Sequence, residues 1–360
     1  MTVFESVGAD GHEQVMYGFD PVSGLRTIIA IHSTALGPAL GGTRFFAYGK
    51  EDEALIDVLR LSRGMSYKAA AAGLDLGGGK AVIIGDPLTD KSERLFRAYG
   101  RLVDSLRGRY ITAEDVGTTT RDMELVRRET RWAVGTSMAE GGSGDPSPVT
   151  ARGLFAALTA VAERLWNSSE VGGRRVAVQG VGKVGAAFVR LLVEARAEVI
   201  VADTYEPAAV KVAEQFGVKM VDPEDIASVD CDVFSPCALG AGINPTTIPR
   251  LGCQAVVGSA NNQLATDEDA DRLAAAGILY APDFVVNAGG LINVYEELRG
   301  YSKNRALHRV DSIKMATRRV LDQADRDGVN PHVAAVRVAE RRMKEIGDLR
   351  RFRRGGDDRN

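Results

Sequence analysis

Three ionisable residues in the first third of the chain have neighbours that suit proton chemistry. Lys68 lies among small and apolar residues in GMSYKAAAAGL, and Lys80 follows three glycines in LDLGGGKAVII. Asp115 ends a strand-like run in ITAEDVGT. Lysines are rarely buried without a partner. Burial and a second lysine nearby would both favour loss of the ammonium proton, so Lys80 is predicted to act as a general base.

Each lysine also has a simpler interpretation. Lys80 could be a surface lysine after a turn, and Lys68 could be a helix lysine whose stem lies along apolar surface. The spacing alone does not show that the two side chains meet.

Strands and helices of the first 140 residues would position these side chains. Runs of apolar and β-branched residues predict strands at 25–33, 80–85 and 109–115. Apolar residues at helical spacing predict helices at 52–73 and 92–106, with Ser92 as the N-cap of the second. The segment 140–149, EGGSGDPSPV, is rich in Gly, Ser and Pro and predicts a loop at a domain boundary.

The second part of the chain alternates between strand and helix patterns. After a predicted helix at 150–166, apolar strands and helices alternate from residue 174 onward, and the chain is helical after about residue 305. Repeated β-α-β units with apolar strands predict a parallel sheet covered by helices on both faces.

A glycine-rich motif follows the first of these strands. It fits G-x-G-x-x-G and opens the next helix, which is the context of a dinucleotide-binding Rossmann motif; its residues are Gly180, Val181, Gly182, Lys183, Val184 and Gly185. Asp203 ends the next strand, where an acidic residue binds the ribose hydroxyls and repels the extra phosphate of NADP. We therefore predict NAD as the cofactor. The alternative is a strand–helix turn that binds no ligand.

Composition narrows the class of protein. The chain has 360 residues, a net charge of -3 and three cysteines without C-x-x-C spacing. We expect two domains, reduced thiols, and binding of neither nucleic acid nor membrane. Without a signal-peptide pattern or a run of roughly 18 apolar residues, a cytoplasmic location is predicted. The Arg-rich C-terminus could touch nucleic acid, but a frayed, solvated helix end is the simpler interpretation.

Seven ordered segments resemble the glutamate/leucine/phenylalanine/valine dehydrogenase family, over about residues 12–345, and most of all its branched-chain members. They are HSTALGPALGGTR, GMSYKAAAAGLDLGGGKAVIIGDP, ITAEDVGT, GVGKVG, SPCALGAGIN, GSANNQLA and GILYAPDFVVNAGGLINV. The resemblance implies that Lys68 binds the substrate carboxylate, that Lys80 activates water, and that Asp115 exchanges a proton with the amino group. Asn262 would help to hold the carboxylate. The resemblance assigns the nicotinamide end of the cofactor to Thr150 and Asn261, and Asn287 is a further candidate for cofactor binding.

The resemblance also maps a side-chain pocket of apolar or glycine positions, namely Leu40, Gly41, Met65, Ala113, Leu291 and Val294. An unpaired buried carboxylate is costly, so this pocket disfavours glutamate. The bulk of Leu291 favours valine, with leucine and phenylalanine as alternatives, because one methylene is worth only about 1–3 kcal/mol.

We therefore expect an α/β protein of two domains with a cleft between them. Residues 1–140 would form a substrate-binding and oligomerisation domain, and residues 141–330 a Rossmann-type NAD domain. A C-terminal helix at about 331–360 would pack back on the first domain. The Ser-Pro loop and the segment 287–290 are candidate hinges, and a homo-oligomer is implied by the family.

Two functions of other classes stay open. A 2-hydroxy-acid dehydrogenase that uses NAD would need a His–carboxylate pair, and a regulator that binds NAD without turnover would have no use for the two lysines and Asp115. The four histidines are far apart in sequence, and no cluster of metal ligands is predicted.

Overall fold

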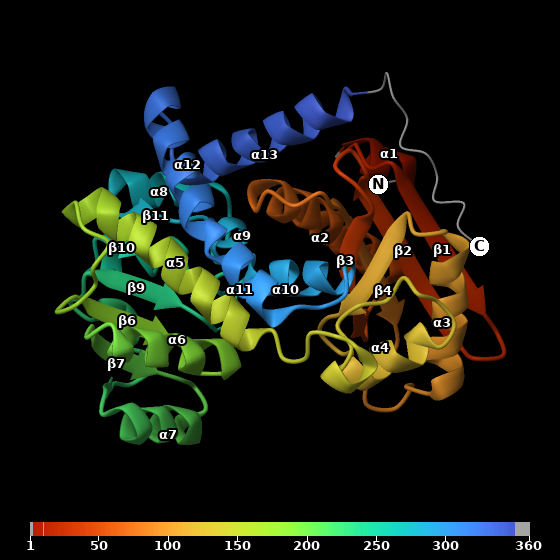
Figure 1. Cartoon of the computed structure of the whole chain (residues 1–360), viewed down its shortest axis with the longest axis horizontal. Coiled ribbons are helices and arrows are strands. Elements are labelled where there is room, and N and C mark those ends of the chain that lie inside the picture. Colours follow the sequence, from red (N-terminus) through yellow and green to blue (C-terminus); the bar gives the residue numbers. More distant parts are fainter. Residues whose placement is uncertain (1–2, 10, 239, 350–360) are drawn as a thin grey trace.

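The computed structural model describes residues 3–9, 11–238 and 240–349. It forms two domains, each built on its own β-sheet (Figure 1). The two-domain α/β organisation is as predicted. Among the described residues, no helix combines the length and apolar character that crossing a bilayer requires.

The N-terminal domain has a five-stranded mixed sheet in the order β1-β2-β4-β3-β5. Its strands are β1 (Gln14–Asp20), β2 (Leu25–Ser33), β3 (Ala39–Phe46), β4 (Gly77–Ile84) and β5 (Tyr110–Glu114). The first two pairings are antiparallel, whereas β3 runs parallel to both β4 and β5. The domain's helical elements are α1 (Val3–Ala9), α2 (Glu51–Ala71), α3 (Glu93–Ser105), α4 (Thr120–Arg127) and the 3₁₀ turn η1 (Met138–Glu140).

Helices cover both faces of this sheet, which explains its nearly continuous apolar strands. Along β2, Ile28 and Ala30 face the apolar side of α2, whereas Ile29 and Ile31 pack with α3 on the other face. The predicted strand at 25–33 and the predicted N-cap are confirmed, since the Ser92 hydroxyl accepts from the backbone N–H of Leu95 at 3.2 Å.

The structure corrects the predicted strand at 80–85. Strand β4 begins at Gly77, so the three glycines lie within the strand and Lys80 is in its middle instead of opening it. A side chain at Gly78 would meet the backbone and hydroxyl of Ser66 on α2 at about 2 Å. Glycine is therefore needed for helix and sheet to approach closely, and this is why the run contains no turn.

The second domain has a six-stranded parallel sheet in the order β11-β10-β9-β6-β7-β8, which confirms the predicted parallel arrangement. Its strands are β6 (Arg175–Gln179), β7 (Glu198–Ala202), β8 (Lys219–Met220), β9 (Val233–Pro236), β10 (Ala255–Val256) and β11 (Leu279–Tyr280). Its helical elements are α5 (Ser147–Trp166), α6 (Lys183–Glu194), α7 (Glu206–Phe216), α8 (Glu268–Ala275), α9 (Asp283–Val286), and the 3₁₀ turns η2 (Ile226–Ser228) and η3 (Ile248–Arg250).

Four further helices complete the chain. They are α10 (Gly289–Glu297), α11 (Lys303–Val310), α12 (Ser312–Asp327) and α13 (Pro331–Gly347). Helix α13 crosses from α12 to α2 of the first domain (Figure 1), where the Arg342 guanidinium donates to the Leu74 carbonyl at 2.6 Å. The segment 287–290, considered as a hinge, is the junction of α9 and α10. The tail 350–360 lies outside the described residues.

Candidate active site

One face of the N-terminal sheet carries the predicted catalytic residues. Because side chains alternate along a strand, Leu40, Gly42 and Arg44 of β3 share a face. Lys80 of β4 projects from this face, as do Ala113 and, just after β5, Asp115. Gly42 makes room for the carboxylate, because a Cβ there would lie 2.9 Å from the Asp115 Cβ.

Lys80 and Asp115 form a close ion pair at the centre of this face. The Lys80 Nζ lies 2.6 Å from the Asp115 Oδ2, and the Lys80 side chain is only 8% exposed. Burial alone would raise the pKa of Asp115, but the Lys80 ammonium and then the Arg44 guanidinium outweigh burial and hold that pKa below its usual value. The carboxylate is therefore ionised in this arrangement.

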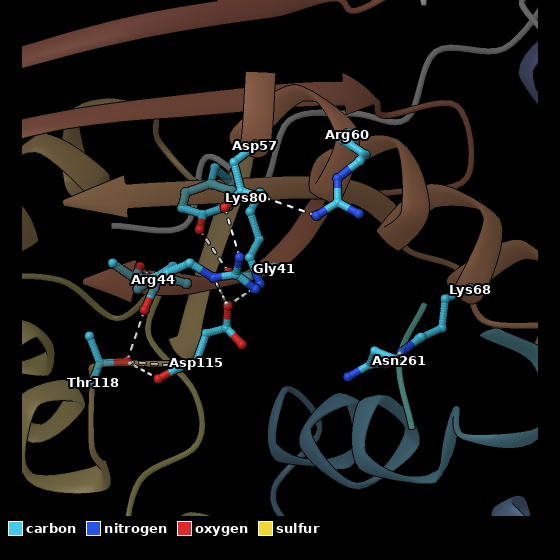
Figure 2. A network of polar contacts seen from close by, with 12 residues as sticks. Gly41, Arg44, Asp57, Arg60, Lys68, Lys80, Asp115, Thr118 and Asn261 are labelled. Carbon is cyan, nitrogen blue, oxygen red and sulfur yellow. Dashed lines mark hydrogen bonds and ion pairs between the residues drawn. The ribbon is translucent and has the colours of Figure 1, made fainter. Parts of the chain in front are cut away.

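Lys68 lies on α2, across the cavity from this pair (Figure 2). Its Nζ donates to the Asn261 Oδ1 at 3.1 Å, and the Asn287 Nδ2 donates to the same oxygen at 2.9 Å. Desolvation is the largest influence on Lys68 and lowers its pKa to about 8. Since its partner is an amide oxygen and not a carboxylate, the ammonium is available for a substrate anion.

A cavity of about 420 Å³ joins these groups. Most of the predicted substrate and nicotinamide positions line it: Leu40, Met65, Lys68, Lys80, Ala113, Asp115, Thr150, Val184, Asn261, Asn262, Asn287, Leu291 and Val294. Gly41 does not line it. Its Cβ position faces the Gly79 carbonyl at 1.7 Å, and the cavity wall at this point is Gly42.

Arg44 and its partner Asp57 were not predicted from the sequence. Arg44 contacts Asp115, and its Nη1 donates to Asp57 at 2.7 Å. Both Arg44 and Arg60 line the cavity. The signal that could have revealed Arg44 is its spacing of two residues from Gly42, but GPALGGTR was not recognised as a strand.

The glycine-rich motif lies between β6 and α6, as predicted. Gly180 has φ of 94°, which favours glycine, and a Cβ on Gly185 would lie 2.0 Å from the Gly180 carbonyl oxygen. A Cβ on Gly182 would meet only open space, and no side chain caps α6 at this N-cap residue. Backbone N–H groups of α6 are thus exposed to an approaching anion.

Asp203 follows β7 and lines a second cavity of about 280 Å³ together with Gly180. Its Oδ2 accepts from the Val181 N–H and its Oδ1 from the Tyr205 N–H, both at 2.8 Å. These bonds fix the carboxylate at the edge of the cavity, where further lone pairs can accept hydroxyl groups. Val181, Gly182, Lys183 and Gly185 line neither this cavity nor that of Lys80.

In the cavity that contains Lys80, the polar groups of Thr150 and Asn287 fit the carboxamide of a nicotinamide dinucleotide. The Oδ1 of Asn287 is buried and has no hydrogen-bond partner among the described residues. The Thr150 hydroxyl donates to the Pro146 carbonyl at 3.0 Å, so its oxygen can still accept a hydrogen bond. Two acceptors at the cavity wall match the two N–H groups of a carboxamide.

Comparisons with known proteins agree with this geometry. Residues 13–132 match the family model described as Glu/Leu/Phe/Val dehydrogenase, dimerisation domain, and residues 141–207 and 201–350 match that described as Glutamate/Leucine/Phenylalanine/Valine dehydrogenase. The chain is 49% identical to leucine dehydrogenase of Bacillus subtilis, covering 96% of this chain and 95% of the relative. It is also 49% identical to valine dehydrogenase of Streptomyces virginiae, with 96% and 97% coverage.

A solved structure extends the likeness to three dimensions. L-tryptophan dehydrogenase from Nostoc punctiforme superimposes with a TM-score of 0.86 at 44% identity, covering 96% of this chain and 99% of that one. The resemblance inferred from the seven segments is thereby confirmed. The chain belongs to the glutamate/leucine/phenylalanine/valine dehydrogenase family of amino-acid dehydrogenases.

Proposed function

We propose that this enzyme oxidatively deaminates a branched-chain L-amino acid, valine above all, to the 2-oxo acid and ammonia, with NAD as the cofactor. The observation that carries the proposal is the single cavity in which Lys68, Lys80 and Asp115 meet an apolar wall. The charged α-amino and α-carboxylate groups of a small amino acid, and its apolar side chain, would all have partners in this cavity.

The apolar wall supports a hydrocarbon side chain. Leu40, Met65, Ala113, Leu291 and Val294 supply it. The cavity also contains Arg44 and Arg60, but both guanidinium groups are bound to Asp57. The Asp57 carboxylate already balances part of their charge, which weakens their attraction for a distal carboxylate of glutamate and supports the apolar substrate class.

The chain's own residues orient the substrate and move its protons. The Lys68 ammonium holds the substrate carboxylate, with Asn262 beside it. The Asp115 carboxylate accepts a proton from the substrate amino group, and Lys80 removes a proton from the attacking water. Bound NAD would accept the hydride from the α-carbon. Holding these groups in one orientation supplies much of the rate enhancement.

The residues present fit NAD rather than NADP. Asp203 brings a fixed carboxylate to the cavity beside Gly180, and a 2′-phosphate there would meet like charge. The nicotinamide carboxamide would be held by Thr150 and Asn287, with Asn261 next to it.

We also propose that the enzyme is a homo-oligomer in the cytoplasm, with the domain boundary near residue 140. The edge strand β1 exposes Phe19 by 74%, and Val22 beside it is 78% exposed. Apolar side chains at an unpaired sheet edge favour association between copies of the chain.

The deciding experiment measures NADH formation at 340 nm with NAD and a panel of L-amino acids at alkaline pH. Turnover with valine, leucine or isoleucine supports the proposal, provided that Lys80→Ala lowers kcat by about 10²–10⁴-fold while NADH still binds. Turnover with a 2-hydroxy acid alone would refute it. That outcome is disfavoured, because the described residues that line the cavity include no histidine.

A further inference from the structure

Arg44 lies between the catalytic pair and a second carboxylate. Its Nε donates to the Asp115 Oδ2 at 3.3 Å, and its Nη1 donates to the Asp57 Oδ2 at 2.7 Å. Its side chain is 22% exposed and lines the catalytic cavity. Lys80 and Arg44 thus contact the same carboxylate oxygen from two neighbouring strands (Figure 2).

Asp57 is itself held in place on α2. Its Oδ2 accepts from the Tyr48 hydroxyl at 2.7 Å, and its Oδ1 accepts from the Arg60 Nη2 at 3.1 Å. Burial raises the pKa of the Tyr48 phenol, and the bond to Asp57 raises it further, so this donor keeps its proton at alkaline pH. The anchor of Arg44 is therefore fixed across the working pH range.

Resting on the proposed function, we propose that Arg44 is a positioning residue that keeps Asp115 ionised and in place after Lys80 has given up its proton. To act as a base, Lys80 must become neutral, and Asp115 then loses the cation at 2.6 Å. A guanidinium stays charged at every pH of interest. Arg44 alone of the two contacting cations supplies a charge that the reaction does not remove.

The burial of Asp115 makes a second cation necessary. Asp115 is largely desolvated, and desolvation is the largest single influence on its pKa, which it raises. Without any cation the carboxyl would hold its proton and could not accept one from the substrate. The charged groups that face this site from each packed element are Lys80 (β4), Arg44 (β3), Glu114 (β5), Asp57, Arg60 and Lys68 (α2) and, from the second domain, Asp283.

A merely structural role for Arg44 makes a different prediction. Arg44 joins β3 to α2 through Asp57, so its loss would weaken the packing of the domain. Such a loss would lower the unfolding midpoint but would leave the ionisation of Asp115 and the pH profile of kcat unchanged. The two roles are therefore separable by a titration.

The first experiment measures kcat and the KM for valine from pH 6 to pH 10 in the holoenzyme. For Arg44→Met we expect kcat to fall by about 10²-fold, with KM changed less than about threefold, and the acid limb of the kcat profile to move up by about one pH unit. Arg44→Lys should recover part of kcat. Arg97→Gln is the matched control, because Arg97 also joins two carboxylates of this domain, Glu93 and Glu129, and lines none of the cavity.

The second experiment follows Asp115 without turnover. Infrared difference spectra between low and neutral pH report the carboxyl C=O stretch, which Asp115→Asn assigns. In Lys80→Met the carboxyl should stay ionised at pH 7 because Arg44 remains, and in the double variant with Arg44→Met it should protonate at a pH at least one unit higher. Equal titrations in the single and double variants would overturn the proposal.

The two experiments distinguish a failure of the proposed function from a failure of the positioning role of Arg44. If the wild-type enzyme oxidises no amino acid, the proposed function fails, and the infrared titration still decides the role of Arg44. If the wild type turns over valine and Arg44→Met has an unchanged pH profile, the positioning role fails alone.

Discussion

Replacing Lys68 with methionine is expected to stabilise the protein and to weaken substrate binding strongly. Burial in the cleft, with a smaller contribution from Lys80, lowers the pKa of the Lys68 ammonium from 10.5 to about 8, although two carboxylates oppose this effect. The folded protein therefore carries the ammonium at a higher free energy than the unfolded chain does. Methionine is one heavy atom shorter than lysine but keeps an unbranched, uncharged stem, and the Asn261 oxygen keeps its bond from Asn287 at 2.9 Å.

The size and sign of the effect follow from the two protonation equilibria. One pH unit corresponds to about 1.4 kcal/mol, so a change from 10.5 to about 8 has an upper limit of about 3.4 kcal/mol at pH 7. Lys68 is partly open to water, which screens the charge and reduces the expected gain to about 1–2 kcal/mol. Below pH 8 the full free-energy cost of burying the Lys68 ammonium is present. Between pH 8 and 10.5 the folded protein binds fewer protons than the unfolded chain, so wild-type stability rises.

Urea unfolding at pH 7 and at pH 10, at one fixed protein concentration, measures this effect. Lys68→Met should be more stable than the wild type at pH 7, and the difference should shrink at pH 10, while the KM for valine rises by about 10²-fold or more at neutral pH. Lys211→Met, an exposed lysine of α7, is the control and should change neither quantity. A Lys68→Met protein that is no more stable at pH 7, or whose gain persists at pH 10, would refute the reasoning.

Three further changes test other parts of the molecule. Gly185→Ala would bring a Cβ within 2.0 Å of the Gly180 carbonyl oxygen, so thermal unfolding should show a loss of about 1–3 kcal/mol, together with weaker NADH binding by fluorescence; an unchanged melting temperature would contradict the tight helix–strand contact. Asp203→Ser should raise kcat/KM with NADP relative to NAD by about tenfold or more, and an unaltered ratio would remove Asp203 from the ribose site. Leu291→Ala should shift the kcat/KM ratio from valine toward leucine and phenylalanine by about 10–100-fold, whereas an unaltered ratio would place the side-chain pocket elsewhere.

The sequence indicated the candidate chemical groups more clearly than the strands that position them. The glycine-rich motif was recognisable because both the following helix and the next strand, with its terminal Asp203, are local in sequence. The parallel sheet followed from the same local alternation of strand and helix. Tertiary contacts had no such signal, and the closeness of Lys80 to Asp115 depends on the pairing of β3 with both β4 and β5.

Glycine residues led to incorrect sequence-based predictions at two places. The run Gly77–Gly79 resembled a turn, but its residues lie in a central strand where α2 presses against the sheet. In PALGGTR, the two glycines of β3 face opposite sides of the sheet, so Gly42 borders the cavity and Gly41 does not. A motif match shows which position of the family a residue occupies. It does not show which face of the sheet the side chain is on when the register of the strand is unknown.

In the proposed mechanism, the charges around Asp115 favour the change of Lys80 from an ion-pair partner to a base. The carboxylate is contacted by Lys80 at 2.6 Å and by Arg44 at 3.3 Å before any substrate is present. An amino acid bound as proposed, with its carboxylate at Lys68, would bring its own ammonium to Asp115, so that one negative group would face three positive groups. Repulsion among these cations favours loss of a proton from the substrate or from Lys80, since Arg44 cannot release one. Substrate binding should therefore release protons into a weakly buffered solution, an effect that a pH indicator would record.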